Sequence, residues 1–262
     1  MTILITGSSG FLGQRVVSAL STGNGREPVV VWSREREGSL LDSAQRQRGL
    51  DSLEPSAVLH IAWGRTGSSG YEHSDEHFRW YEASRDFADE ARERGIWFGA
   101  VGSGADSADS DTPMSAYRDA KMRLRVDLDG WLRAGEVALL RPFHLFDAFE
   151  LRPRVVRDFL LRDRTAAFEI RNPQAAHDFI HVSDAAAGVG LATDARMSGV
   201  INVGTGIRRS VFQLLNSIEP DAGINPADRA PRSSLAEERD QPYRLRAAGW
   251  APIVTEHVFE RE

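Results

Sequence analysis

The chain has 262 residues, of which 41% are hydrophobic and 27% charged, as is ordinary for a soluble globular protein. Its 32 Lys and Arg residues against 38 Asp and Glu residues give a net charge of −6, which argues against a general nucleic-acid binder. The absence of cysteine excludes disulfides and cysteine-ligated metals, and without a basic leader or an apolar run of roughly 20 residues we expect a cytoplasmic protein with no membrane partner.

Short apolar runs alternate with longer amphipathic stretches over the first part of the chain. Unbroken apolar runs are typical of strands covered on both faces of a sheet, and we expect such strands at 2–6, 29–32, 57–62, 96–101 and 137–143. The spacing of apolar residues between them predicts helices at 11–21, 76–94 and 115–134. This alternation predicts an α/β protein with a parallel sheet and right-handed crossovers.

The pattern changes after about residue 144. An Arg-rich amphipathic helix is predicted at 151–164 and one more strand at 200–204, while the tail from residue 220 is rich in Pro, Asp and Arg. We therefore expect a nucleotide-binding type of sheet domain over 1–143, which residues 175–205 rejoin, and a smaller, less regular region over 144–262.

Three glycines follow the first predicted strand, in the sequence GSSGFLG. Gly7 would allow a tight turn, Gly10 a close approach of the backbone to a pyrophosphate, and Gly13 a close packing of helix on strand. The free N–H groups and the positive dipole end of the helix would then face the phosphates. The spacing is GxxGxxG rather than GxGxxG, so a glycine-rich turn without a ligand is the alternative, but the position between strand and helix favours a dinucleotide.

The second predicted strand ends in WSRER. Ser33 and Arg34 stand where an acidic residue would bind the ribose 2′-hydroxyl of NAD. Arginine at this place suits the 2′-phosphate of NADP, so we expect NADP(H) as the preferred cofactor and NAD(H) as the alternative. Plain surface charges are the other interpretation of Arg34 and Arg36.

Lys121 is the only lysine in the chain, and Tyr117, one of four tyrosines, precedes it by four residues. On a helix the two side chains share one face. An ammonium beside a phenol lowers the pKa of the phenol, which makes tyrosine a usable general acid or base. Lysine can also bind ribose hydroxyls with a compact charge that arginine replaces poorly. Ser103, just after the strand at 96–101, could hydrogen-bond the carbonyl oxygen that Tyr117 protonates. An exposed Tyr–Lys pair and an ordinary loop serine are the alternatives.

The histidines give weaker signals. His73 and His77 are four residues apart but have no evident third ligand, so we expect solvated residues at a helix end and no metal site. His60 lies inside a predicted buried strand, where a hydrogen-bonded core histidine is expected. His144 follows a strand at its carboxyl end, where ligands gather in such sheets, and could contact substrate or nicotinamide or have a structural role.

Taken together, these segments resemble one protein family. GSSGFLG, AVLHIA, Ser103, YRDAK, LRPF, HDFIHVSD, INVGTG and LRAAGWAP occur in the order seen in extended short-chain dehydrogenases/reductases, the NAD(P)-dependent epimerase/dehydratase family of nucleotide-sugar enzymes. The resemblance covers about residues 1–250. It implies a Rossmann-type doubly wound parallel sheet, a bound nicotinamide cofactor, a C-terminal region that holds a nucleoside-diphosphate sugar, and a catalytic triad of Ser103, Tyr117 and Lys121.

The resemblance and the arginine content together indicate two sets of contacts. The expected cofactor contacts are Gly7, Ser9, Gly10, Phe11, Leu12, Gly13, Ser33, Arg34, Ser39, Leu40, Ile61, Ala62, Trp63, Tyr117, Lys121, Pro142 and His144. The expected substrate contacts are Ser103, His144, Arg154, Arg208 and Arg232, because arginine binds a pyrophosphate with two donors at once. The chain departs from the family pattern where Ser39 replaces an Asp, Asp147 a Gly and His177 an Arg. These departures leave the cofactor chemistry intact and the substrate open.

The features predict an NADP-dependent reductase of a nucleotide-linked keto-sugar, most concretely a dTDP-4-keto-6-deoxyhexose 4-ketoreductase. The nearest alternative is an NAD-dependent nucleotide-sugar 4-epimerase, and the choice depends on Ser33 and Arg34. A dehydratase is less favoured, because Gly104 and Ala105 stand where such enzymes have an acidic pair. A non-catalytic NADP sensor would not require a Tyr-xxx-Lys pair.

We also expect a homodimer. The predicted helices at 76–94 and 115–134 carry apolar residues beyond what one sheet face needs, and similar enzymes pair such helices in a four-helix bundle.

Overall fold

The computed structural model describes residues 1–22, 27–64, 71–106, 114–147, 155–163, 168, 170, 172–219, 234–237 and 240–259. A parallel sheet with strand order β2-β1-β3-β4-β5-β9 forms its centre. These strands are β1 (Ile3–Thr6), β2 (Val29–Val31), β3 (Ala57–His60), β4 (Trp97–Val101), β5 (Val137–Pro142) and β9 (Gly199–Val203). A parallel sheet with this doubly wound strand order is consistent with a Rossmann-type fold, so the predicted fold class is confirmed.

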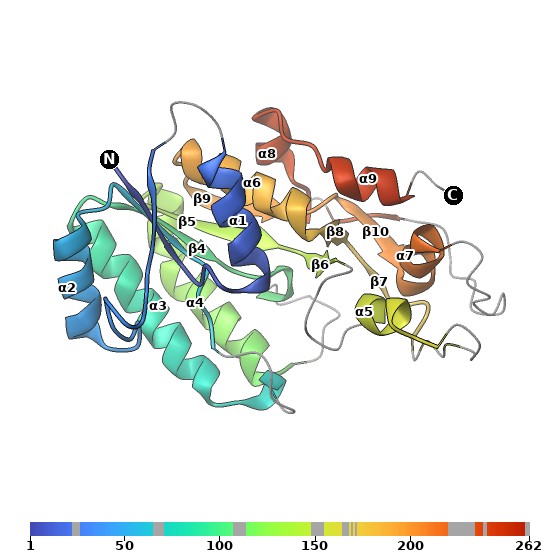
Figure 1. Ribbon diagram of the computed structural model, residues 1–262, viewed down its shortest axis with the longest axis horizontal. Helices are drawn as coiled ribbons and strands as arrows, with labels where there is room; N and C mark the ends of the chain where they lie inside the picture. Colours follow the sequence, from blue (N-terminus) through green and yellow to red (C-terminus); the bar gives the residue numbers. More distant parts are fainter. Residues whose placement is uncertain are drawn as a thin grey trace.

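Helices cover both faces of the sheet (Figure 1). They are α1 (Phe11–Ser21), α2 (Ser43–Leu53), α3 (Glu76–Glu93), α4 (Ala116–Ala134) and α6 (Val182–Asp194). On one face α1 and α6 share a buried cluster with the sheet that includes Ile5, Val16 and Val189. On the other face α2, α3 and α4 pack on a second cluster that includes Leu50, Phe87 and Leu128. Burial on both faces explains why the strands are unbroken apolar runs.

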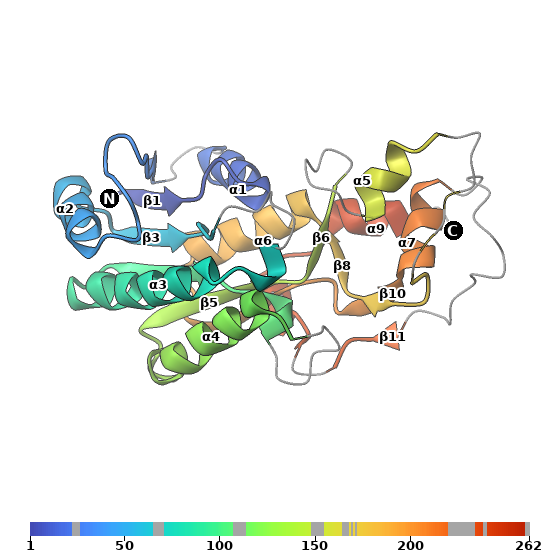
Figure 2. The ribbon, with the colours of Figure 1, turned by 90° about the horizontal axis from the view of Figure 1, so that it is seen from below.

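The C-terminal elements form a smaller group at one end of the molecule, beyond β6 and β8 (Figure 2). β6 (His144–Phe146) and β8 (Phe179–His181) pair in parallel, and β10 (Ile207–Ser210) pairs antiparallel with β7 (Ala176–His177) and β11 (Ser234–Leu235). The helices of this group are α5 (Val155–Leu160), α7 (Val211–Ile218) and α9 (Ile253–Phe259). A separate apolar cluster around Phe159, Phe179 and Leu214 holds this group together. Helix α8 (Tyr243–Ala247) instead packs beside β9 and α6, where Leu245 joins the cluster that α1 and α6 share with the sheet.

Helix α4 shows how the local sequence sets an element's ends. The Ser115 hydroxyl accepts a hydrogen bond from the Arg118 backbone N–H at 3.2 Å and caps the first turn. Gly135 ends the helix in the left-handed region at φ 75°, where a residue without Cβ has no steric cost.

Some helices differ from the sequence predictions. The predicted helix at 151–164 is limited to α5 within the described residues 155–163, and α2, α6 and α7 were not predicted. Among the described helices, none combines the length and apolar character that a membrane crossing requires.

Candidate active site

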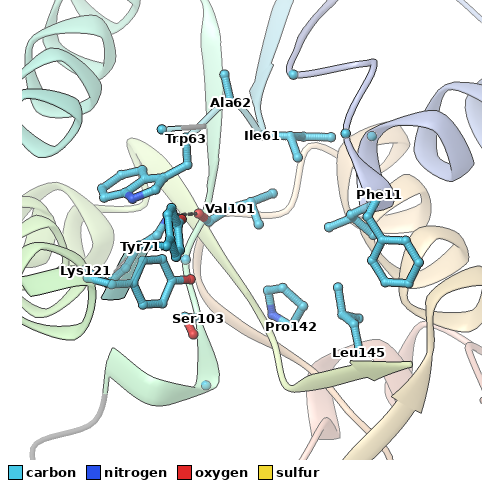
Figure 3. A pocket seen from close by; sticks show the side chains of 18 of the residues that line it. Phe11, Ile61, Ala62, Trp63, Tyr71, Val101, Ser103, Lys121, Pro142 and Leu145 are labelled. Carbon is cyan, nitrogen blue, oxygen red and sulfur yellow. Dashed lines mark hydrogen bonds between the residues drawn. The ribbon is translucent and has the colours of Figure 1, made fainter. Parts of the chain in front are cut away.

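A cleft of about 530 Å³ opens at the carboxyl ends of β1, β3, β4 and β5. In the sheet, β2 lies on one side of β1 and β3 lies on the other, so the strand order reverses at β1. Ligands of doubly wound sheets bind at such a point. Figure 3 shows Trp63, Lys121 and Ser103 on one wall of the cleft and Phe11 and Leu145 on the opposite wall.

Most of the residues expected from the sequence lie along this cleft. Those that line it are Gly7, Ser9, Gly10, Phe11, Leu12, Gly13, Ile61, Ala62, Trp63, Ser103, Tyr117, Lys121, Pro142 and His144. Described residues that do not line it are Ser33, Arg34, Ser39, Leu40 and Arg208. Arg154 and Arg232 lie outside the described residues.

The glycine turn forms the floor of the cleft at the start of α1. Gly7 adopts φ 71°, and a Cβ atom there would lie 2.6 Å from the Ala62 backbone nitrogen. A Cβ atom on Gly13 would lie 2.1 Å from the Gly7 carbonyl oxygen, so only glycine permits this contact of helix and turn. Gly10 caps α1 without a side-chain hydrogen bond from the described residues, and the first turn contains no acidic residue. The N–H groups of this helix end are therefore suited to an anion such as a pyrophosphate.

The end of β2 carries a carboxylate that the sequence did not suggest. The Glu37 side chain turns back and accepts a hydrogen bond from the Ser33 backbone N–H at 2.6 Å. Arg36 lies 3.7 Å from the same carboxylate, whose side chain is only 10% exposed. Arg34 is exposed beside it. An acidic and a basic group thus stand together at the end of β2. In dinucleotide-binding sheets an acidic group at such a strand end binds the ribose 2′-hydroxyl of NAD, whereas an arginine accommodates the 2′-phosphate of NADP.

Ser39 and Leu40 make contacts within the loop before α2. The Ser39 hydroxyl accepts a hydrogen bond from the Leu41 backbone N–H at 3.3 Å. Leu40 is buried in the cluster under α2, and its carbonyl accepts a hydrogen bond from the buried Arg46 at 2.8 Å. The structure therefore gives these two residues a part in the packing of the loop before α2.

Tyr117, Lys121 and Ser103 come from two elements and meet in the cleft. Tyr117 and Lys121 lie one turn apart on α4, and Ser103 follows β4 directly. The Lys121 Nζ donates a hydrogen bond to the Val101 carbonyl at 2.9 Å and lies 6.0 Å from the centre of the Tyr117 ring. A phenol, an ammonium and a hydroxyl thus line one cleft. Together such groups can transfer a proton to a carbonyl oxygen and stabilise the charge that develops on it.

The Lys121 ammonium is deeply buried. Lys121 is 4% exposed. Burial lowers the pKa of its ammonium from 10.5 to about 7, against a smaller opposing effect of the Asp106 carboxylate. The indole ring of Trp63 lies against the ammonium, with Nζ 3.4 Å from the ring centre. The only lysine of the chain therefore has a pKa close to neutral pH, and its ammonium lies between the Val101 carbonyl and the Trp63 ring at the wall of the cleft.

A buried ionic network supports the turn that carries Ser103. The Asp106 backbone N–H donates to the Ser103 carbonyl at 3.1 Å, and its carboxylate accepts from the Arg141 Nε at 2.7 Å. Arg141 also donates to Asn202 at 2.8 Å and to Asp240 at 3.3 Å. Burial raises the pKa of Asp106, while Arg141 and Arg125 oppose that rise. The network ties the serine turn to β5, β9 and the C-terminal segment.

His60 is a hydrogen-bonded core residue, as predicted. Its Nδ1 is 2.8 Å from the Thr6 hydroxyl and its Nε2 is 2.9 Å from the Ser84 hydroxyl. Burial lowers the pKa of His60 to about 3, with smaller contributions in the same direction from the positive charges of Lys121 and Arg46. The ring is therefore neutral at physiological pH.

The prediction for His77 was wrong. Its side chain is not solvated but buried, at 1% exposure. The Trp63 Nε1–H donates to His77 Nδ1 at 3.0 Å, and His77 Nε2 donates to the Tyr71 carbonyl at 2.6 Å. Tertiary contacts with the cleft wall, which no local pattern shows, account for the difference. His73 is exposed, as expected, and the described residues contain no cluster of acidic and histidine side chains suited to a metal ion.

The expected substrate side is partly outside the cleft. His144 lines the cleft, and its ring centre lies 3.9 Å from that of His177. Arg208 donates through Nε and NH2 to the Ala176 carbonyl, at 3.2 and 2.8 Å, which holds its guanidinium against β7. At the departure from the family pattern, Asp147 accepts a hydrogen bond from Arg15 on α1 at 3.1 Å and so links the two parts of the molecule.

Some cleft residues were missed from the sequence. They include Tyr71, Glu72, Ser115, Arg118 and Phe143. Ser115 and Arg118 flank Tyr117, so their sequence position was the available signal. Tyr71 and Glu72 approach through a single turn of 3₁₀ helix before α3, and nothing in their spacing indicates this.

A sequence comparison now identifies the family. The profile of the NAD dependent epimerase/dehydratase family matches residues 3–204. The chain belongs to this family. It is therefore an enzyme of the extended short-chain dehydrogenase/reductase type. No curated protein sequence matches the chain significantly.

Solved structures of family enzymes have the same fold as this chain. A UDP-glucose 4-epimerase of Thermus thermophilus in complex with NAD is 19% identical, with 98% of this chain and 99% of that chain covered and a TM-score of 0.68. RMD from Pseudomonas aeruginosa complexed with NADPH is 17% identical, with 99% and 98% covered and a TM-score of 0.72. A dTDP-4-dehydrorhamnose reductase of Clostridium acetobutylicum is 16% identical, with 100% and 98% covered and a TM-score of 0.72. At these identities the likeness concerns the fold.

Proposed function

We propose that this member of the NAD-dependent epimerase/dehydratase family reduces the keto group of a nucleotide-linked keto-sugar with NADPH. One observation carries the proposal: an uncapped helix end after a glycine turn and a Tyr117–Lys121–Ser103 group line the same cleft. The first suits a pyrophosphate and the second suits proton transfer to a carbonyl. A dTDP-4-keto-6-deoxyhexose is the most concrete substrate.

The residues present fit a nicotinamide dinucleotide. The N–H groups at the start of α1 would bind its pyrophosphate, and the close Gly7–Gly13 contact keeps side chains away from that place. Lys121 would bind the nicotinamide ribose, and Pro142 and Ile61 would flank the nicotinamide end. When bound, the cofactor supplies the hydride that reduces the ketone carbon.

The chain's own residues handle the oxygen and the proton. Ser103 would donate a hydrogen bond to the ketone oxygen and stabilise the negative charge that develops on it. Tyr117 would then donate its phenolic proton to that oxygen, so the ketone becomes an alcohol. The positive charge of Lys121 favours the tyrosinate that remains, which lowers the barrier to proton transfer. Arg154 and Arg232, from the C-terminal region over 144–262, are our candidates for binding the substrate's diphosphate.

The preference for NADP is supported by Arg34, an exposed guanidinium just beyond β2. Arginine binds a phosphate with two parallel hydrogen bonds. The similar RMD structure contains NADPH, which agrees with a reducing enzyme on this fold.

An NAD-dependent 4-epimerase is the second candidate, and Glu37 is the observation that favours it. Its carboxylate lies 2.6 Å from the Ser33 backbone nitrogen, at the strand end where an acidic group binds the ribose 2′-hydroxyl of NAD and repels a 2′-phosphate. The similar Thermus thermophilus epimerase was solved with NAD. Such an enzyme would oxidise and then re-reduce one carbon.

Stoichiometry separates the two candidates. The purified protein is mixed with NADPH or NADH and a panel of dTDP- and UDP-linked 4-keto-sugars, and in parallel with UDP-glucose and UDP-galactose. The proposal expects one NADPH oxidised for each keto-sugar consumed. Turnover of a UDP-hexose without net change in nicotinamide would establish the epimerase instead, and no turnover in either arm would refute both.

A further inference from the structure

The Lys121 ammonium lies against the Trp63 indole, which belongs to none of the proposed catalytic residues. The Trp63 ring centre lies 3.4 Å from Nζ, closer than the Tyr117 ring at 6.0 Å. An ammonium on the face of an indole is attracted by the ring's negative face, and this attraction is strongest where water is excluded. With the lysine only 4% exposed, the indole substitutes for part of the hydration that burial removes.

One buried side chain, His77, accepts the hydrogen bond of that indole. The Trp63 Nε1–H donates to His77 Nδ1 at 3.0 Å, and the His77 ring lies nearly parallel to the indole, at an angle of 20°. On its other side, His77 Nε2 is 2.6 Å from the Tyr71 carbonyl, which only accepts. An imidazole with a proton on Nε2 and none on Nδ1 makes both of these hydrogen bonds.

The same imidazole also contacts the catalytic tyrosine. The centre of its ring lies 5.3 Å from that of Tyr117 and 4.5 Å from that of Tyr71, both edge to face. His77 itself is 1% exposed and does not line the cleft. It thus contacts the rings around the reacting groups without reaching the space where a substrate would bind.

We propose that His77 is a positioning residue, which holds the Trp63 indole against the Lys121 ammonium and thereby fixes the lysine beside Tyr117. The role of Lys121 and Tyr117 in turnover rests on the proposed function, whereas the arrangement itself does not. Without the His77 acceptor, the indole N–H has to find another partner, and the ring loses its fixed orientation over the ammonium.

The unique lysine allows a direct test. Protein grown with ¹³C-labelled lysine gives the signals of one lysine, and its ε-methylene protons should resonate upfield of a free lysine because they lie near the face of the Trp63 ring. His77→Leu should move this resonance most of the way toward the free position. His77→Asn should keep it, because its carboxamide oxygen can accept the indole N–H. His73→Leu, at an exposed position on the preceding turn, is the matched control and should leave the resonance unchanged.

Circular dichroism establishes that each variant is folded. An unchanged lysine resonance in folded His77→Leu would overturn the proposal, as would an equal displacement in His77→Asn. If His77→Leu does not fold, ¹⁵N-labelled histidine in the wild type decides: the proposal expects His77 with its proton on Nε2, and a proton on Nδ1 at neutral pH would refute it. These signals require neither cofactor nor substrate, so they stand even if the proposed reaction fails. If the positioning role and the proposed reaction are both correct, His77→Leu should lower kcat about tenfold, and His77→Asn should keep most of the wild-type kcat.

Discussion

Replacing Lys121 with methionine should make the protein more stable at neutral pH. The ammonium is 4% exposed, and folding lowers its pKa from 10.5 to about 7, mainly through burial. Between these two values the unfolded chain holds a proton that the folded protein releases, so the wild type gains stability as the pH rises through this window. Methionine has a similar length and no charge, and therefore removes this dependence.

The size of the effect follows from the difference between the folded and unfolded pKa of Lys121. A difference of one in pKa corresponds to about 1.4 kcal/mol, so the buried charge costs roughly 4 kcal/mol of unfolding free energy at pH 7. Methionine loses the hydrogen bond to the Val101 carbonyl, which contributes about 1 kcal/mol. Lys121→Met should thus be more stable than the wild type by roughly 3 kcal/mol at pH 7, and the two should be equal near pH 10.

Urea unfolding at pH 7, 8 and 9 measures this difference, and titrating groups that do not interact with Lys121 cancel because both proteins share them. Arg133→Met is the matched control on the same helix, since the Arg133 side chain is 80% exposed and arginine keeps its charge throughout this range. A difference between wild type and Lys121→Met that stays constant from pH 7 to pH 9 would refute the reasoning. So would a variant that is less stable at pH 7.

Three further outcomes are expected. Arg34→Asp should reverse or abolish a preference for NADPH over NADH in titrations of both cofactors, because it would repel a 2′-phosphate; equal affinities in the wild type would contradict the NADP assignment. Ser103→Ala should lower kcat by roughly 10²-fold with little change in KM, because its hydrogen bond strengthens as charge develops; an unchanged kcat would exclude the role. Sedimentation at micromolar concentration should give a homodimer joined through α3 and α4, and Val126→Asp, at a position 70% exposed on α4, should shift it to monomer, whereas a monomeric wild type would end this expectation.

Local sequence was sufficient for much of the sheet and for the cleft's best-defined residues. The unbroken runs found β1, β3, β4 and β5 because burial on both faces imposes an apolar residue at every position. Gly7 and Gly13 could be predicted because their constraint is local: a turn and a helix must approach within the space that a Cβ would fill. Tyr117 and Lys121 could be paired because helical spacing alone puts them on one face.

The features that were missed depend on contacts between distant segments. His77 looked like a solvated residue because its partners, Trp63 and the Tyr71 carbonyl, are brought to it by folding. The Asp106–Arg141 pair joins residues 35 positions apart, and neither residue's neighbours in sequence indicate an ion pair. Glu37 lies only four residues from Ser33, but its side chain returns to the strand end through a turn whose geometry the sequence does not specify.

The central claim is that Tyr117 donates the proton in this cleft, and Tyr117→Phe tests it most directly. The phenylalanine ring keeps the contacts of the tyrosine with Trp63, Tyr71 and His77, so the variant should retain its thermal stability and its affinity for NADPH. With the keto-sugar that the wild type reduces, its kcat should fall by roughly 10²-fold or more. A folded, cofactor-binding Tyr117→Phe with a kcat near that of the wild type would contradict the account.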